Sequence, residues 1–460
     1  MIDKKVVNRH IYSILLPMVF ENILTISASM VTAALVGRLA TMDISAQGLS
    51  SRVTGIYYSL FRGLAIGVTV LSALYFGEGK KEKIRGVLRQ AFITIIPFCI
   101  AASALIIAFA EPFTRIFTDD PVLISLTVSY LRLLSPFLPF LATTFFVTAA
   151  FQAQGNTKAP MIIAGIVNII NIVLGWLLIF GNAGAPALGL QGAGLSLGIA
   201  YTIGAIIGLV WLYLPNKGFF ANMPKEPLFS LDKKDLTEIF TIGLPAAGEM
   251  LLWQFATIII SRVIISYSPD HYAAYMLGLN AEGVCEMMTV GFVTAATTLS
   301  ANAIGRRDDA LYRTYYAQLS KICIAVSILC TAIFFFGNTF LMSMLTDKQH
   351  LIEIGAKYLF AMGVTQVPMN LNKIQNGFLR SSGHKYAPVI ITLFGTWGIR
   401  VICCCLVGWV FHWSIDFIWW SIVLDLVARF FICYIFLKKN HVLDAVQILN
   451  AQENAELASV

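Results

Sequence analysis

The chain resembles itself at one offset of 228 positions, and this similarity constrains its fold more than any other feature. The offset holds without a gap from the first predicted helix to the fifth. It relates pairs that include Leu16-Pro17 and Leu244-Pro245, Glu21 and Glu249, Gly63 and Gly291, Thr118-Asp119 and Thr346-Asp347, Tyr130 and Tyr358, and Gly155 and Gly383. A constant offset over this length predicts two structurally equivalent halves.

Apolar residues dominate both halves. Hydrophobic residues make up 58% of the chain and charged residues 12%, whereas soluble domains carry about 25% charged residues. Stretches of about 20 apolar residues are long enough to cross a hydrocarbon core of about 30 Å. They recur about twelve times, at 12–36, 53–76, 91–110, 123–149, 160–181, 191–214, 239–267, 272–304, 322–342, 353–379, 387–411 and 414–437. The sequence therefore predicts an all-α polytopic membrane protein.

One polar, proline-bearing and basic linker separates the sixth span from the seventh. It predicts an N-terminal six-helix lobe at 1–214, a cytoplasmic linker at 215–238, a C-terminal six-helix lobe at 239–438 and a cytoplasmic tail at 439–460. The tail is polar, and we expect a short segment or disorder. Because each half holds an even number of spans, the lobes should be parallel repeats related by a pseudo-two-fold along the membrane normal.

Basic residues collect in alternate connections, which explains the net charge of +7 without a nucleic-acid partner. This asymmetry follows the positive-inside rule and predicts a multi-pass protein of the cell membrane with both termini in the cytoplasm. The connections that are rich in basic residues include Lys80, Lys81 and Lys83; Lys217, Lys225 and Lys233; Arg306 and Arg307; Arg380 and Lys385; and Lys438 and Lys439. The basic start leads into a full span with no cleavage site, so the first helix should serve as its own insertion signal.

Cysteine and histidine patterns argue against metal and enzyme chemistry. All eight cysteines fall in predicted spans and none forms a CxxC pair, so no metal site and no cofactor other than a coupling ion is expected. The six histidines lie at span ends or in connections. A membrane-embedded enzyme would need a histidine with an aspartate or a serine at membrane depth. We therefore predict that the protein is not an enzyme.

Ionisable groups within the spans are the functional candidates, because each costs roughly 2.5–3.5 kcal/mol at the bilayer centre. Two equivalent halves in so apolar a chain are typical of transporters that rock around a central site. Glu282 and Glu286 lie one helical turn apart and could share a proton. With Glu249 they are the main ion-coupling candidates. The alternative is that one or more of them pairs with Arg400 or Arg262.

Other buried charges have structural interpretations. Glu21, a fourth coupling candidate, lies at the same estimated depth as Arg62, and the two could neutralise each other. Asp425 and Arg429 are four residues apart, which favours a self-neutralising pair. Lys373 is expected near the cytoplasmic end of its span, where it could extend its amine to the interface.

Four residues are candidates for lining a substrate cavity. Trp253 and Gln254 lie within about a turn of Glu249 and could contact a flat cation, although ordinary packing explains them as well. Arg400 falls near mid-depth, and Asn171 lies in the fifth span.

Prolines at equivalent positions occur inside the first and seventh spans. Pro17 and Pro245 each remove a backbone hydrogen bond. They are hinge candidates, and static kinks are the alternative interpretation.

Several motifs, taken in order, resemble the multidrug and toxic compound extrusion (MATE) family over about residues 10–438. Leu-Pro opens spans one and seven, and glycine-bearing segments end spans two and eight. Span one ends Leu35-Val36-Gly37-Arg38, and the runs Gln152-Ala153-Gln154-Gly155-Asn156-Thr157-Lys158-Ala159-Pro160 and Asn168…Asn171-Ile172-Val173-Leu174 are similar to the family's fifth helix. The resemblance implies two six-helix lobes in a V and export of amphipathic, often cationic, compounds by antiport against H⁺ or Na⁺.

The chain departs from the family pattern in its first half. Many bacterial members carry acidic residues at places that align with Thr32 and Gly175 here, whereas Asn171 matches. The amino-terminal carboxylate site is therefore not carried over. Some relatives use carboxylates in spans seven and eight, the region that holds Glu249 and Glu282.

The expected function is secondary active export of small, cationic organic molecules across the bilayer. One chain contains both lobes, so a monomer should suffice. The alternative is a lipid-linked saccharide flippase of the same superfamily, which would hold pyrophosphate with cations. Buried cations keep that alternative open: Arg62, Arg132, Arg262, Lys373 and Arg400.

Overall fold

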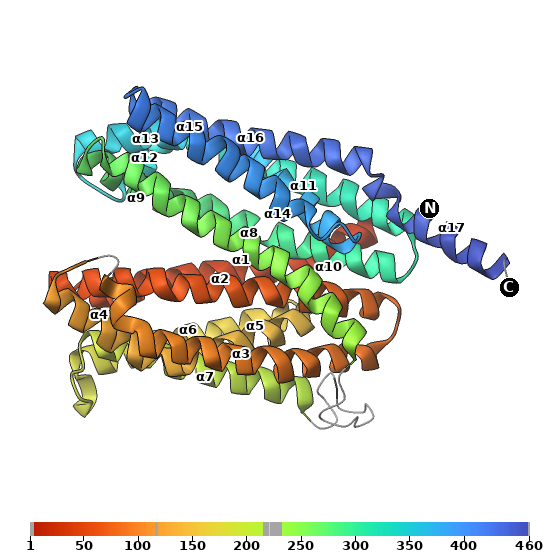
Figure 1. The fold of residues 1–460 in the computed structure, drawn as a ribbon, viewed down its shortest axis with the longest axis horizontal. Helices are drawn as coiled ribbons and strands as arrows, with labels where there is room; N and C mark the ends of the chain where they lie inside the picture. Colours follow the sequence, from red (N-terminus) through yellow and green to blue (C-terminus); the bar gives the residue numbers. More distant parts are fainter. Residues whose placement is uncertain (1–3, 116–117, 215–219, 221–231, 459–460) are drawn as a thin grey trace. The chain divides into compact units, whose positions relative to one another are not determined.

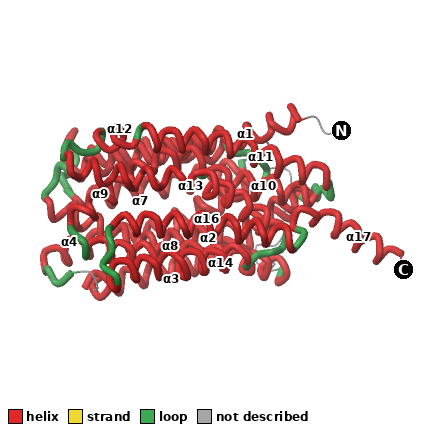
Figure 2. The backbone as a smooth tube through the Cα atoms, turned by 90° about the horizontal axis from the view of Figure 1, so that it is seen from above, coloured by secondary structure: helices red, strands yellow, loops and turns green. Residues whose placement is uncertain are grey.

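The chain is helical throughout the part that the structure, a computed structural model, describes. That part comprises residues 4–115, 118–214, 220 and 232–458. Figure 2 shows helices joined by loops and no strand in these residues, which confirms the predicted all-α class. The predicted linker 215–238 falls largely outside the described residues.

The helices follow one another along the chain as labelled in Figure 1. The first half contains α1 (Lys4–Val36), α2 (Thr41–Gly77), α3 (Lys81–Arg115), α4 (Pro121–Leu134), η1 (Ser135–Phe137), α5 (Leu138–Ala153), α6 (Lys158–Phe180), η2 (Asn182–Gly184) and α7 (Leu190–Tyr213). The second half contains α8 (Lys233–Ile265), α9 (Pro269–Thr289), α10 (Gly291–Gly305), α11 (Asp309–Phe336), α12 (Asn338–Ser343), α13 (Gln349–Ser381), α14 (Ala387–Thr392), η3 (Leu393–Val401), α15 (Ile402–Cys405), η4 (Leu406–Val410), α16 (Ile415–Lys439), η5 (Val442–Asp444) and α17 (Ala445–Ala458).

Membrane-spanning length and composition recur through the fold. Within the described residues, eleven helical segments are long and apolar enough to cross a membrane. Helix α13, which corresponds to the predicted span 353–379, is as long as the others, with 33 residues, but more polar. The predicted polytopic helical membrane protein is confirmed, with α13 as the long helix that differs from the rest.

Breaks and turns recur at the sequence offset. Helix α3 has non-helical backbone angles at Phe109 (φ −105°, ψ 17°), and Gly337, which is 228 positions later, separates α11 from α12 with φ −109° and ψ 6°. Gly155 and Gly383 both have positive φ, at 76° and 90°, a conformation that glycine adopts without strain. The two halves therefore bend their helices at corresponding positions.

The chain divides into two compact units, and α1 and α8 contribute to both. The C-terminal unit contains Met1–Val19, Gly77–Gly79 and Gly248–Val460, and the N-terminal unit contains Phe20–Phe76 and Lys80–Ala247. Each of these two helices changes unit at the same place, after Val19 in α1 and after Ala247 in α8, which are 228 positions apart. The domain boundaries expected from the linker stay a prediction.

Two equivalent glycines allow close packing of the first parts of α8 and α1, the helices that contribute to both units. In the N-terminal unit, a Cβ at Gly63 of α2 would lie 2.2 Å from the Cα of Ala247 in α8, a separation that no side chain permits. The equivalent Gly291 of α10, in the C-terminal unit, faces the side chains of Met18 and Leu15 on α1. The matching glycines thus receive the first part of α8 in one unit and of α1 in the other.

The tail beyond 439 is ordered where it is described. Val442 and Val446 are buried, and the Tyr312 hydroxyl of α11 donates to the Val442 carbonyl at 3.2 Å. Residues 439–460, expected from sequence as a short segment or disorder, therefore include helix α17, which begins against α11.

Candidate functional site

Helix α13 brings polar side chains into the interior of the C-terminal unit. It packs against α9, α10, α11 and α16, and its buried side chains include Tyr358, Asn370, Gln375, Asn376 and Arg380. Polar groups in such surroundings require partners. Tyr358, Asn370 and Arg380 donate hydrogen bonds to neighbouring helices, whereas the side-chain carbonyl oxygens of Asn370 and Gln375 have no hydrogen bond among the described residues. This explains why α13 is less apolar than the other long helices.

Glu249 of α8 forms an ion pair with Arg380 of α13. The Arg380 side chain is 7% exposed and that of Glu249 is 18% exposed, while the Thr392 hydroxyl donates to the second carboxylate oxygen at 3.3 Å. Arg380 was expected in a cytoplasmic connection. That expectation was wrong, because α13 continues to Ser381 and carries Arg380 on its buried face.

Glu286 of α9 pairs with Lys373 of α13. The lysine amine lies 2.7 and 2.9 Å from the two carboxylate oxygens and donates to the Thr289 hydroxyl at 3.0 Å. Because the Lys373 side chain is only 16% exposed, its predicted extension to the interface is corrected: the amine is held by an acidic partner inside the unit.

Glu282 of α9 differs from these two carboxylates because its hydrogen-bond partner is neutral. The Tyr358 hydroxyl donates to Glu282 at 2.7 Å. The Tyr358 ring is fixed by edge contacts with Tyr275 and Trp419, at centroid distances of 5.4 and 5.1 Å. Among the described residues, Glu282 forms no ion pair, and it shares no hydrogen bond with Glu286.

Asp425 of α16 lies between two arginines. Arg400 Nε is 2.7 Å from Asp425 Oδ2, and Arg429 Nε is 2.8 Å from Oδ1. These are ion-pair distances, and the well-aligned hydrogen bond is the one from Arg429 Nη2 at 2.9 Å. The predicted pairing of Asp425 with Arg429 is confirmed, and Arg400 joins it instead of a glutamate. Gly395 of the π-helix η3 permits this approach, since its Cβ would meet Arg429 and Asp425.

These eight ionisable residues, here called the charged cluster, balance in charge. Four are acidic and four are basic: Glu249, Glu282, Glu286, Asp425, Lys373, Arg380, Arg400 and Arg429. Two ion pairs are self-contained, and the second arginine at Asp425 supplies the positive charge that offsets Glu282. The cluster is neutral when Glu282 is ionised and carries one positive charge when Glu282 binds a proton.

The N-terminal unit contains a neutral cluster instead. The Asn171 amide of α6 donates to the Thr32 hydroxyl of α1 at 3.1 Å, and the Ser196 hydroxyl of α7 donates to the Asn171 carbonyl oxygen at 3.2 Å. Asn171 is 6% exposed. Gly175 faces Ser196, and a Cβ there would lie 3.5 Å from the serine oxygen, an ordinary van der Waals contact.

Glu21 of α1 lacks the partner that sequence suggested. One of its carboxylate oxygens is buried without a hydrogen bond among the described residues. Arg62 of α2 instead lies over the Phe145 ring, 5.5 Å from its centroid. The two side chains form no ion pair within the described part of the N-terminal unit.

The remaining candidates are residues of α8 near Glu249 and two prolines inside helices. Trp253 is 46% exposed and Gln254 is half-buried. The Trp397 indole donates to the adjacent Leu252 carbonyl at 3.1 Å. Pro17 lies inside α1 and Pro245 inside α8, each two residues before its helix changes unit.

Sequence reasoning missed Arg380 and Tyr358 as members of the site. Tyr358 was visible as the repeat partner of Tyr130, but nothing marked its hydroxyl as a donor. Arg380 could have been found by extending the tenth span by one residue beyond its predicted end.

Comparisons with known proteins agree with this architecture. A sequence model of the MatE family matches residues 17–177 and 245–406, two stretches that together cover more than half of the chain. The "Probable multidrug resistance protein NorM" of Thermotoga maritima is 24% identical over 427 residues, which span 92% of this chain and 90% of that protein. The "Uncharacterized transporter YisQ" of Bacillus subtilis is 26% identical over 404 residues, 85% of this chain and 86% of that protein.

Solved structures share the fold. A MOP superfamily transporter from Pyrococcus furiosus superimposes with a TM-score of 0.88 at 17% identity, over 96% of this chain and 97% of its own. The expected resemblance is confirmed by the family match over both halves. The chain therefore belongs to the MatE family and is a multi-pass membrane transporter rather than an enzyme.

Proposed function

We propose that the protein exports small amphipathic, cationic compounds by antiport against an entering ion, with both termini in the cytoplasm and the helices in the cell membrane. The observation that carries this proposal is Glu282, a carboxylate with a neutral partner within a cluster of paired charges. The names of the curated relatives in Thermotoga maritima and other bacteria support drug-like substrates. Trp253, which is exposed, offers a flat surface for an aromatic cation.

Glu282 is the proposed ion-binding residue. Glu249 and Glu286 each form an ion pair with a cation, whereas Glu282 has a neutral partner. Binding of a positive ion at Glu282 changes the cluster from neutral to one positive charge, in surroundings where charge is costly. A ligand drives a conformational switch only through unequal affinity for the two states, and this change of charge supplies such a difference.

A proton suits this site better than a sodium ion. The Tyr358 hydroxyl and the Glu282 carboxylate offer few oxygens, whereas hard metal cations take several oxygen ligands. Within the described residues, no group of three acidic, histidine or cysteine side chains could hold a metal ion. We therefore propose H⁺ as the coupling ion.

Two of the cations that suggested the flippase alternative are already neutralised by acidic partners. Lys373 is paired with Glu286, and Arg400 is paired with Asp425. A pyrophosphate site needs cations whose charge is not already neutralised. The charge balance of the cluster thus favours the exporter.

Alternating access would use the two equivalent prolines as hinges. Pro17 and Pro245 each precede a change of unit by two residues, and the backbone hydrogen bond that proline removes leaves the helix easier to bend there. Replacement of either proline by alanine should slow the exchange between states.

The test follows efflux of ethidium, a fluorescent organic cation, from proteoliposomes that contain the full-length protein. A pH gradient and a sodium gradient are imposed separately. We expect the pH gradient to drive efflux and Glu282→Gln to reduce it at least tenfold. Equal efflux with Glu282→Gln would remove Glu282 from the mechanism, and efflux driven by sodium alone would replace H⁺ with Na⁺.

The matched control is Glu353→Gln, the same chemical change at an exposed position of α13 outside the cluster. It should leave efflux unchanged. A folded wild-type protein that moves ethidium under neither gradient would contradict the exporter itself.

A further inference from the structure

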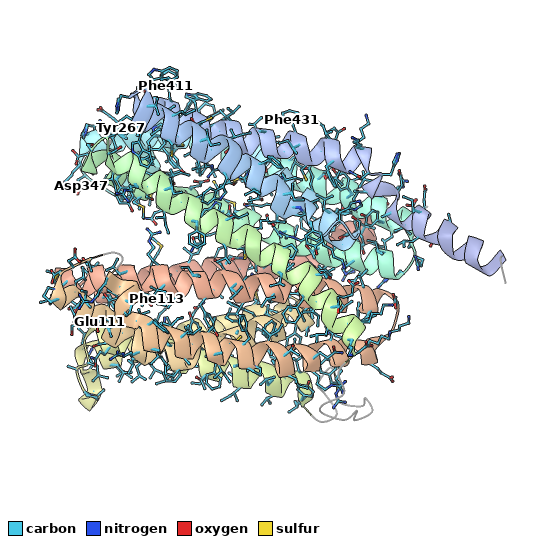
Figure 3. The ribbon with its side chains drawn as sticks, viewed as in Figure 1. Glu111, Phe113, Tyr267, Asp347, Phe411 and Phe431 are labelled. Atoms are coloured by element: carbon cyan, nitrogen blue, oxygen red, sulfur yellow. The ribbon has the colours of Figure 1, made fainter. Side chains whose placement is uncertain are left out.

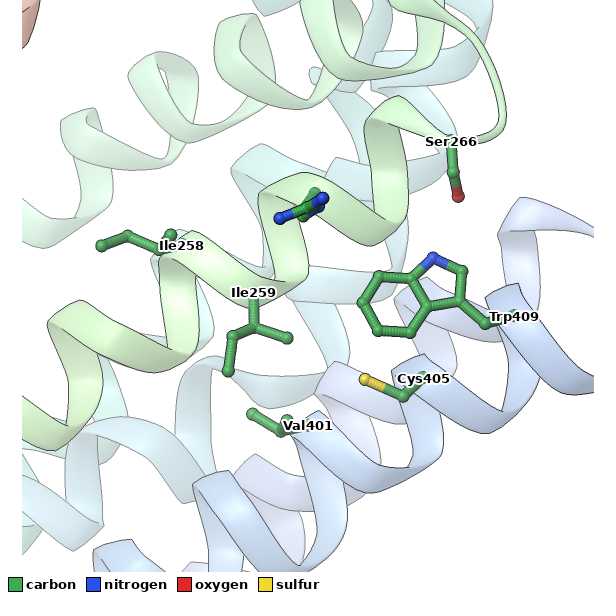
Figure 4. A pocket seen from close by; sticks show the side chains of 7 residues that line it. Ile258, Ile259, Ser266, Val401, Cys405 and Trp409 are labelled. Carbon is green, nitrogen blue, oxygen red and sulfur yellow. The ribbon is translucent and has the colours of Figure 1, made fainter. Parts of the chain in front are cut away.

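A groove runs along the surface of the C-terminal unit between α8 and the helix that contains η3, α15 and η4. It has a volume of about 670 Å³. Figure 4 shows its two sides, with Ile258 and Ile259 on α8 and Ser266 directly after this helix, facing Val401, Cys405 and Trp409. Along each side, lining residues recur every four positions, so they lie on one helix face. Eight residues correspond to about 12 Å, most of the depth of one leaflet.

Arg262 places a single positive charge in this otherwise apolar lining. It stands one turn from Ile258 and from Ser266, in the last turn of α8, and its residue is exposed. It forms no ion pair and no side-chain hydrogen bond among the described residues. Arg262 is therefore not part of the charged cluster, although the sequence suggested it as an alternative partner for the glutamates.

The end of the groove nearest Trp409 is fixed by contacts between the two helices. The Tyr267 hydroxyl donates to the carbonyls of Trp413 and Val407, at 2.7 and 3.3 Å. Figure 3 shows Tyr267 and Phe411 at the same end of the C-terminal unit. At Gly408 a Cβ would lie 2.4 Å from Val263, so the helices touch there. A groove with one fixed end can hold a ligand in a defined position.

The facing helix has an unusual backbone. Segments Leu393–Val401 and Leu406–Val410 are π-helical, a conformation that is rare and often found at functional sites. Val401 and Trp409 both belong to these segments.

We propose that this groove is a binding site for an anionic phospholipid, whose acyl chain lies between the two helices and whose phosphate is bound by Arg262. The apolar lining matches an acyl chain, and the unpaired guanidinium matches a phosphate, which it binds through charge-assisted hydrogen bonds. Trp409, which is 45% exposed, is the residue type that gathers at the level of lipid headgroups. The site is separate from the charged cluster and does not depend on the proposed transport mechanism.

Native mass spectrometry of the full-length protein, released from detergent micelles that contain phosphatidylglycerol, tests the proposal. The wild type should retain bound phosphatidylglycerol. Arg262→Gln should reduce apparent affinity about tenfold, the effect of losing one strong charged contact. The control Arg115→Gln removes the same charge from the last turn of α3 and should retain lipid like the wild type.

A second variant fills the groove without changing its charge. Cys405→Trp should also lose the lipid, which keeps the test decisive if Arg262→Gln folds poorly. Retention of lipid by a folded Arg262→Gln protein would overturn the proposal. So would displacement of the lipid by an equal concentration of glycerol phosphate, because a free anion lacks the acyl chain that the groove is proposed to hold.

Discussion

The two halves of this transporter place opposite kinds of polar group in equivalent helices. The N-terminal unit joins α1, α6 and α7 through the neutral cluster of Thr32, Asn171 and Ser196, whereas the C-terminal unit contains the charged cluster. The offset of 228 shows two substitutions directly: Gln152 corresponds to Arg380 and Phe145 to Lys373. One architecture therefore accommodates either apolar packing or ion pairs.

Glu21 and Glu249 make the difference clearest. They occupy equivalent positions, two residues after the changes of unit in α1 and α8. Glu249 has Arg380 as a partner. At the position equivalent to Arg380, the first half has the uncharged residue Gln152. The equivalent carboxylates thus differ: Glu249 has a fixed charge partner, whereas Glu21 forms no ion pair among the described residues.

The largest expected effect comes from removal of the anion between two arginines. Asp425→Asn leaves Arg400 and Arg429 without their shared partner in a fully buried position. Breaking a buried pair in this way costs about 3–5 kcal/mol. We expect the free energy of unfolding, measured by denaturant titration in detergent micelles, to fall by that amount. A loss below about 1 kcal/mol would mean that the two arginines find other partners.

A smaller effect should separate the equivalent glutamates. Glu249→Gln leaves Arg380 buried and unpaired, at an expected cost of about 3 kcal/mol, because the site is nearly closed to solvent. Adding Arg380→Gln should restore stability to within about 1 kcal/mol of the wild type. Glu21→Gln, the matched change in the other unit, should alter stability by about 0.5 kcal/mol or less. Equal losses for the two single variants would erase the distinction between the units.

A stability loss smaller than those of Asp425→Asn and Glu249→Gln is expected from the neutral cluster. Asn171→Ala removes two uncharged hydrogen bonds from α6 and should cost about 1–2 kcal/mol. Ethidium efflux should persist with its pH dependence unchanged, since no ionisable group is lost. An altered pH profile for this variant would show that the N-terminal unit takes part in coupling.

The fold was predictable from sequence because its signals are long and redundant. Repeat, apolar span length and charge asymmetry each report on many residues, so single errors do not matter. The pairs were less predictable because each depends on a single rotation of one helix. Lys373 and Glu286 lie on helices whose relative register is set by packing, and depth alone could not distinguish this pair from a lysine at the interface. Asp425 with Arg429 was the exception, because both lie on one helix four residues apart.

The exchange of segments of α1 and α8 between the two units constrains when each unit can be completed during synthesis of the chain. The N-terminal unit includes residues up to Ala247, so it cannot be completed until the ribosome has passed the linker and released the seventh span. Until then Gly63 and its neighbours on α2 lack the segment that covers them. The beginning of α1, made first, must wait for α10 before it finds its place at Gly291. Neither unit can be complete before the shared segments of both helices have been made. We therefore expect the two units to complete their folding in the bilayer together.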